Sequence, residues 1–169
     1  MKNYSSFLII IAFAISSSCA PHKHQNAPNK ISTTSEPTDS LLTSIERGAC
    51  FGACPEYQAN IYKSGFAEYF GRKNVKNLGY FIGKVPKEQM QELLELIRTN
   101  KIEELDSNYV NKHLADYPSY SIRIADKKPR RMIQVMEPNP PAQLSAFTSL
   151  LDRIVSQIEW TRMNPTNDR

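Results

Sequence analysis

Short runs of alternating apolar and polar residues recur between residues 41 and 160, and they predict a sheet built largely from hairpins. In one run, Tyr57, Ala59 and Ile61 share a face. The turn signal Ser64-Gly65 follows, and a second alternating run begins directly after it, so these two segments are predicted to form a β-hairpin. The predicted strands are Leu41–Arg47, Tyr57–Lys63, Phe66–Phe70, Leu78–Lys84, Tyr120–Ile124 and Met132–Met136.

Two segments have the helical period instead. After Pro86, the residues Met90, Leu93, Leu94 and Ile97 fall on a single apolar stripe, which predicts an amphipathic helix. A second stripe follows Asn139-Pro140-Pro141, consists of Leu144, Phe147, Leu151, Ile154 and Ile158, and ends near Trp160. The predicted order is therefore β-β-β-β-α-β-β-α. This order favours an α+β fold, with a largely antiparallel sheet and both helices on one face, in a domain at residues 41–160 before a polar tail at 161–169.

The N-terminus has the composition of a secretory targeting segment. Lys2 supplies a positive charge, Phe7–Ile15 is unbroken apolar sequence, and small residues fill Ser16–Ala20. Nine apolar residues in a helix rise only about 14 Å, roughly half the hydrocarbon core of a bilayer, so the segment is too short to span. We therefore expect it to act as a signal peptide and to be removed.

This segment resembles the signal of bacterial lipoproteins, in which small residues precede a cysteine that is acylated and begins the mature chain. The resemblance implies a signal peptide at residues 1–18, lipidation of Cys19, and anchoring in the envelope of a Gram-negative bacterium, at the outer membrane and facing the periplasm or the surface. Ser16 departs from the pattern, since leucine is usual there. The alternative is ordinary cleavage after Ala20, although Pro21 would then follow the scissile bond. After Cys19, the polar, proline-containing sequence up to residue 40 predicts a disordered tether.

The chain has three cysteines, an odd number that cannot pair completely within one molecule. If Cys19 carries lipid, Cys50 and Cys54 remain, in a domain that the signal sends to a compartment where disulfides persist. We therefore predict a Cys50–Cys54 disulfide. A closed loop of about five residues would stabilise the domain by about 2 kcal/mol through the loss of chain entropy in the unfolded state.

The same cysteines admit a second interpretation. Cys-x-x-x-Cys-Pro resembles the motif of membrane-tethered copper-delivery and thiol-disulfide proteins related to thioredoxin. That resemblance implies a redox or copper carrier in which Cys50 and Cys54 act as thiolates and His113 is the third ligand. In that fold the motif lies between a strand and a helix of a βαβ unit, whereas here an alternating strand and a hairpin follow Pro55.

A broader resemblance covers the whole predicted domain. The stretch Ile45–Tyr57 contains Cys-Phe-Gly-x-Cys-Pro-x-Tyr, and Asp116-Tyr117-Pro118-Ser119, the proline-led last helix and Trp160 follow further along the chain. These features resemble an uncharacterised bacterial family, a domain of unknown function found in secreted proteins and lipoproteins. The resemblance implies an extracytoplasmic module and supplies no catalytic residue.

The charge pattern and the motifs narrow the function. A net charge of +4 with no basic cluster longer than Lys127-Lys128 or Arg130-Arg131 argues against a nucleic-acid partner. No glycine-rich phosphate loop or His-Glu-x-x-His pair occurs, so we expect neither catalysis nor a cofactor. Tyr109, His113 and Asp116 could line a small polar pocket, or Asp116 could cap a turn before the next strand. The expected protein is a module held on the bilayer through acylated Cys19 that binds an envelope protein or a small ligand, or has a structural role.

Overall fold

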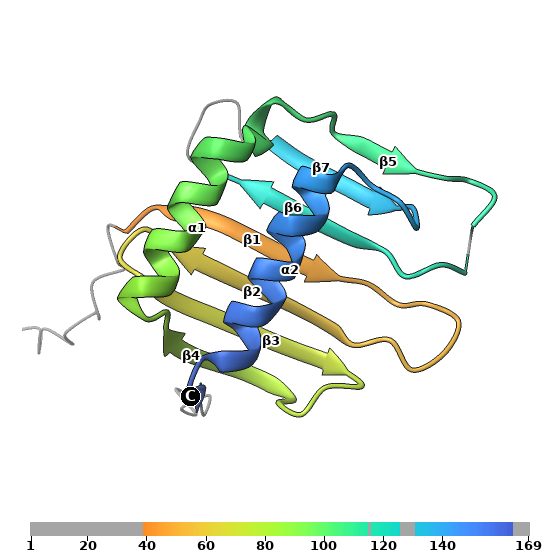
Figure 1. Ribbon diagram of the computed structural model, residues 1–169. Helices are drawn as coiled ribbons and strands as arrows, with labels where there is room; N and C mark the ends of the chain where they lie inside the picture. Colours follow the sequence, from red (N-terminus) through yellow and green to blue (C-terminus); the bar gives the residue numbers. More distant parts are fainter. Residues whose placement is uncertain (1–38, 115, 126–130, 164–169) are drawn as a thin grey trace, which may run out of the picture. The chain divides into compact units, whose positions relative to one another are not determined.

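An eight-stranded sheet with two α-helices packed on one of its faces forms the core of the domain (Figure 1). The computed structural model describes residues 39–114, 116–125 and 131–163. The predicted signal peptide, Cys19, the tether up to residue 38 and the turn at 126–129 lie outside these residues. The strands are β1 (Leu41–Arg47), β2 (Glu56–Tyr62), β3 (Phe66–Lys73), β4 (Gly79–Lys84), β5 (Asn108–Val110), β6 (Tyr120–Ile124), β7 (Arg131–Met136) and β8 (Thr161–Arg162). The helices are α1 (Lys87–Asn100), the 3₁₀ helix η1 (Ile102–Glu104) and α2 (Ala142–Gln157).

The strand order in the sheet is β5-β7-β6-β1-β2-β3-β4-β8. The pairs are antiparallel except for β5 with β7, which is parallel. The prediction of an α+β fold with a largely antiparallel sheet is confirmed. The two outermost strands were not predicted: β5 lies between the predicted first helix and the predicted strand at Tyr120, and β8 lies in the predicted polar tail.

The predicted hairpin is present as β2 and β3. Ala59 pairs with Tyr69 and Ile61 with Ala67, and all four side chains are buried on the helix-covered face. Gly65 has a φ of 85°, a left-handed conformation that glycine adopts without steric cost, so the chain can turn back within a few residues.

Both helices bury an apolar stripe against the sheet, and Leu93, Leu144, Phe147, Leu151 and Ile154 have no exposed surface. The predicted stripe of α1 is wrong at one position, because the side chain of Leu94 is 48% exposed. No helix within the described ranges combines the length and the apolar composition needed to cross a membrane.

The segment after α2 is held by close packing against β4. A Cβ atom added at Gly83 would lie 3.1 Å from Cε3 of Trp160 and would overlap the side chain of Ile158. This close approach explains why a glycine stands at this position of β4. The missing side chain lets Trp160 lie over the sheet, where it borders the pocket described next.

Candidate ligand-binding pocket

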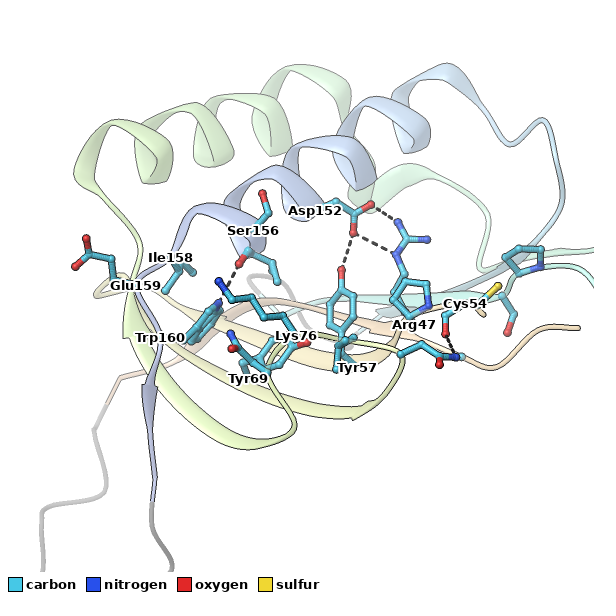
Figure 2. A pocket seen from close by; sticks show the side chains of 18 residues that line it. Arg47, Cys54, Tyr57, Tyr69, Lys76, Asp152, Ser156, Ile158, Glu159 and Trp160 are labelled. Carbon is cyan, nitrogen blue, oxygen red and sulfur yellow. Dashed lines mark hydrogen bonds and ion pairs between the residues drawn. The ribbon is translucent and has the colours of Figure 1, made fainter. Parts of the chain in front are cut away.

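A pocket of about 850 Å³ lies where the C-terminal half of α2 crosses the ends of β1, β2 and β3 (Figure 2). Its rim is formed by the β1–β2 loop that carries the two cysteines, by the β3–β4 connection and by the loop before β6. The residues that line the pocket include Arg47, Tyr57, Tyr69, Lys76, Asp152, Ser156, Glu159 and Trp160.

An ion pair with an attached phenol forms the polar wall of the pocket. Nε of Arg47 donates a hydrogen bond to Oδ1 of Asp152 at 3.1 Å, and Nη2 of Arg47 donates to Oδ2. The hydroxyl of Tyr57 donates to the same Oδ1 at 2.7 Å. Figure 2 shows the three side chains meeting beneath α2. The guanidinium also lies over the ring of Tyr120, with Cζ 5.0 Å from the ring centroid. A bidentate pair of this kind fixes both partners in one geometry.

The sheet register explains why these side chains meet. Arg47 pairs with Tyr57 across the antiparallel β1–β2 ladder, so the two side chains emerge side by side on the same face. That face is the one covered by the helices, because Ile45, two residues before Arg47, is buried on it. Asp152 lies on α2 directly after the buried Leu151 and reaches down to the pair from the helix.

The surroundings of the pair shift the pKa values of two of its members. Burial alone would lower the pKa of the Arg47 guanidinium, but the hydrogen bond and the charge of Asp152 outweigh burial and raise it. Burial, reinforced by the negative charge of Asp152, raises the pKa of the Tyr57 phenol well above its ordinary value. At neutral pH Arg47 is therefore a cation and Tyr57 is a neutral hydrogen-bond donor.

These shifts predict a loss of stability at alkaline pH. In the unfolded chain a tyrosine loses its proton near pH 10, whereas folded Tyr57 keeps its proton to a higher pH. Above about pH 10 the unfolded state thus binds fewer protons than the folded state, and the free energy of unfolding falls, by at most about 1.4 kcal/mol per pH unit for this one group.

Urea denaturation at several pH values measures that slope, and Tyr57→Phe is the variant to compare. Below pH 10 the variant is expected to be less stable by about 1 kcal/mol, because it lacks the hydrogen bond to Asp152. Above pH 10 its stability should decline less steeply than that of the wild type. Equal slopes in the two proteins would show that Tyr57 titrates normally in the folded state.

Aromatic rings form the adjoining, apolar wall of the pocket. Tyr57 stacks on Tyr69 with ring centroids 5.3 Å apart, and the ring centroids of Tyr69 and Trp160 are 5.2 Å apart. The indole Nε1 of Trp160 donates to the carbonyl of Val155 at 3.0 Å, which ties this wall to α2. Trp160 is the only tryptophan of the sequence, so tryptophan fluorescence reports directly on the pocket.

The disulfide loop forms one rim of the pocket. Cys50 and Cys54 are joined by a disulfide with Cα atoms 5.8 Å apart, which confirms that prediction. Two hydrogen bonds hold the loop at its ends: the Gly48 N–H donates to the Ser119 carbonyl at 2.9 Å, and the side-chain Nδ2 of Asn74 donates to the Cys54 carbonyl at 3.0 Å. The disulfide therefore fixes a loop that is also tied to two other rim segments.

Reduction of the disulfide is expected to lower the free energy of unfolding by about 2 kcal/mol, since the cross-link closes a short loop. Thermal or urea denaturation with and without reductant measures the change. The double variant Cys50→Ala/Cys54→Ala is the control, because it should show the same loss and no further effect of reductant. An unchanged midpoint in both comparisons would mean that the rim is held by its hydrogen bonds alone.

The residues that the sequence suggested for a polar pocket lie elsewhere. The hydroxyl of Tyr109 accepts a hydrogen bond from the backbone N–H of Asp106 at 3.0 Å, and the backbone N–H of His113 donates to Oδ1 of Asn111 at 3.1 Å. The carbonyl of Asp116 accepts the N–H of Phe51 at 3.3 Å. None of Tyr109, His113 and Asp116 lines the pocket beside the disulfide loop.

The copper interpretation needs two thiolates and an imidazole. In this structure Cys50 and Cys54 are bonded to each other. Within the part of the chain that is described, no group of three or more His, Cys, Asp or Glu side chains is arranged to hold a metal ion.

Sequence reasoning missed Arg47, Asp152 and Lys76 as pocket residues. One signal was present: Arg47 occupies a position of β1 that alternation with Ile45 assigns to the covered face, where an unpaired charge is costly. Asp152 adjoins the apolar stripe of α2, and its carboxylate neutralises the charge of Arg47. Nothing in the sequence indicated that Lys76 would lie beside them.

Taken together, the fold and the pocket define a small α+β module with a disulfide-bordered cavity at one end of its sheet. The chain belongs to the family described as Domain of unknown function (DUF6438), whose family model matches residues 42–155. A comparison with curated proteins finds no match for the chain. The family match covers β1 through most of α2 and thus includes Arg47, Tyr57 and Asp152, whereas Trp160 lies beyond it.

Proposed function

We propose that this protein is a lipid-anchored module of the bacterial cell envelope that binds a small ligand in the pocket beside the Cys50–Cys54 loop. The observation that carries the proposal is the Arg47–Asp152–Tyr57 network in the wall of a cavity of about 850 Å³. Ligand pockets in proteins generally have volumes of about 300–1,000 Å³ and pair apolar walls with a few fixed polar groups. The aromatic wall and the ion pair fit that description.

The direction of β1 separates the pocket from the point where the predicted tether joins the domain. The strand begins at Leu41, next to the predicted tether, and ends at Arg47 in the pocket wall, as its arrow in Figure 1 shows. Seven extended residues cover about 20 Å, so the pocket opens at the far end of the strand from the point where the tether would enter. A ligand in the surrounding fluid would reach it without passing the attachment point.

The proposed lipid anchor is tested by mass spectrometry of the mature protein purified from envelopes. We expect a chain that begins at Cys19 and carries a diacylglycerol modification. The variant Cys19→Ser is the control and should leave the membrane fraction. A mature chain that begins at Pro21 without lipid would instead establish ordinary signal-peptide cleavage and overturn the lipid anchor.

The pocket is tested by screening a fragment library against the soluble domain, with thermal shift and Trp160 fluorescence as readouts. Two exposed serines of α2 offer a matched pair of variants: Ser156 lines the pocket, and Ser149 does not. Ser156→Tyr should abolish binding of the hits by filling the pocket, whereas Ser149→Tyr should leave it unchanged. Equal binding to both variants, or no hit at all, would contradict a ligand site here.

A further inference from the structure

We infer that the ligand of this pocket is an uncharged polyhydroxylated molecule of the saccharide class. The inference rests on the proposed function and narrows it to a kind of ligand. Three features of the pocket carry it: a balanced set of charges, an ion pair that offers both donors and acceptors, and an aromatic wall beside that pair.

The ionisable residues of the lining balance each other. Two are basic, Arg47 and Lys76, and two are acidic, Asp152 and Glu159, so their formal charges cancel. Arg47 and Asp152 are in direct contact, and a charged ligand group that approaches one of them also approaches the other. The attraction and the repulsion then largely offset each other, and an ionic ligand gains little from either. A neutral ligand carries no such penalty.

The ion pair can still form strong hydrogen bonds with a neutral ligand. The Arg47 and Asp152 side chains keep 21% and 38% of their surface exposed, so both can be reached. Figure 2 shows one guanidinium nitrogen pointing away from Asp152, where its N–H groups can donate to a ligand oxygen. The carboxylate accepts hydrogen bonds only. Neighbouring hydroxyls of a sugar ring both donate and accept, so they can satisfy both charged groups at once.

The aromatic wall suits the other surface of such a molecule. A sugar ring presents a face of C–H groups, which is apolar although its edge carries hydroxyls. Tyr57 links the two walls, because its hydroxyl binds Asp152 while its ring stacks on Tyr69, the neighbour of Trp160. Tyr57 and Tyr69 are themselves buried, so the accessible part of this wall is the half-buried Trp160. Pockets with this combination of apolar contact and a few fixed polar groups orient their ligands specifically.

Three related sugars of different charge provide the first test: a neutral methyl glycoside, its uronic acid with a carboxylate at C6, and its analogue with an ammonium at C2. Each of these sugars is titrated into the soluble domain, and binding is followed by Trp160 fluorescence and two-dimensional NMR. Neutral disaccharides and N-acetylated hexosamines are titrated in the same way. Concentrations of about 10 mM suffice to detect a site with a Kd of about 1 mM. We expect binding by neutral members and weaker binding by both charged forms. Preferred binding of the acid or the amine would overturn the inference.

Asp152→Asn provides the second test, because it keeps the shape of the side chain and removes its charge. The Arg47 cation is then no longer neutralised, and preference should shift toward the uronic acid by about tenfold relative to the neutral glycoside. A circular dichroism melt establishes that the variant is folded at the assay temperature. If it is not, Ser156→Tyr replaces it and should abolish the neutral-sugar response that Ser149→Tyr retains.

The outcomes separate this inference from the proposed function. Fragments that bind the pocket while every saccharide fails would overturn the sugar class and leave a ligand site in place. Failure of fragments and saccharides together would overturn both. Binding of a neutral saccharide that Ser156→Tyr does not affect would place the sugar elsewhere on the molecule and also count against the inference.

Discussion

Leu93→Ala is expected to lower the free energy of unfolding by about 3 kcal/mol, whereas the same substitution at the next residue, Leu94→Ala, should change it by less than about 0.5 kcal/mol. The side chain of Leu93 has no exposed surface, while that of Leu94 is 48% exposed. Removing a buried leucine side chain costs its transfer free energy and leaves a cavity between α1 and the sheet. At Leu94 about half of the surface is already in contact with water, and the substitution leaves no enclosed cavity.

The two variants control each other. They remove the same atoms from adjacent positions of α1, and leucine and alanine both have high helix propensity, so burial is the main difference between them. Urea denaturation monitored by circular dichroism measures both changes. Similar losses at the two positions would show that the face of α1 turned toward the sheet differs from the one described here.

Leu94 also shows that helical spacing does not determine which apolar residue lies at the centre of the buried face. Met90, Leu93, Leu94 and Ile97 all fit one apolar stripe, but adjacent residues of a helix point about 100° apart. Both cannot point at the centre of a flat contact. Met90, Leu93 and Ile97 are buried against the sheet, and Leu94 lies at the margin. Which residue lies at the centre depends on the tilt of the helix over the sheet, and tilt is a tertiary property.

The strands were predictable where alternation was long enough to measure. The bounds of β1 and β6 agree with the sequence prediction, and β1 ends at Arg47, directly before Gly48. The strands β5 and β8 contain three and two residues, too few to distinguish an alternating pattern from a loop. Their pairing with β7 and β4 depends on where the chain returns after each helix.

The pocket was only partly visible in the sequence, for a related reason. The disulfide at its rim could be predicted from the spacing of the two cysteines and the expected compartment. The Arg47–Asp152 pair joins residues 105 positions apart, and their contact requires the register of β1 and β2 and the path of α2 to be known. Tyr109, His113 and Asp116 are near one another in sequence, but none of them lines this pocket.

Asp152→Ala is expected to lower the free energy of unfolding by about 2–3 kcal/mol, measured by urea denaturation at neutral pH. The substitution leaves the Arg47 guanidinium without its partner and the Tyr57 hydroxyl without its acceptor. Breaking a fully buried ion pair costs about 3–5 kcal/mol, and the value here is lower because both side chains keep some contact with water. Asp152→Asn should cost less than Asp152→Ala, since the amide oxygen can still accept a hydrogen bond.

The double variant Arg47→Met/Asp152→Ala decides whether the loss arises from the uncompensated cation. Removing Arg47 as well eliminates the charge that Asp152→Ala leaves behind, while methionine retains an apolar chain in place of the arginine stem. The double variant should therefore be more stable than Asp152→Ala alone by about 1 kcal/mol. If the two single losses simply add, Arg47 and Asp152 are not energetically coupled, and the charge balance that favours a neutral ligand loses its physical basis. If coupling is found, each partner offsets the free-energy cost of burying the other. The exposed N–H groups of Arg47 and the carboxylate of Asp152 then remain available to a ligand.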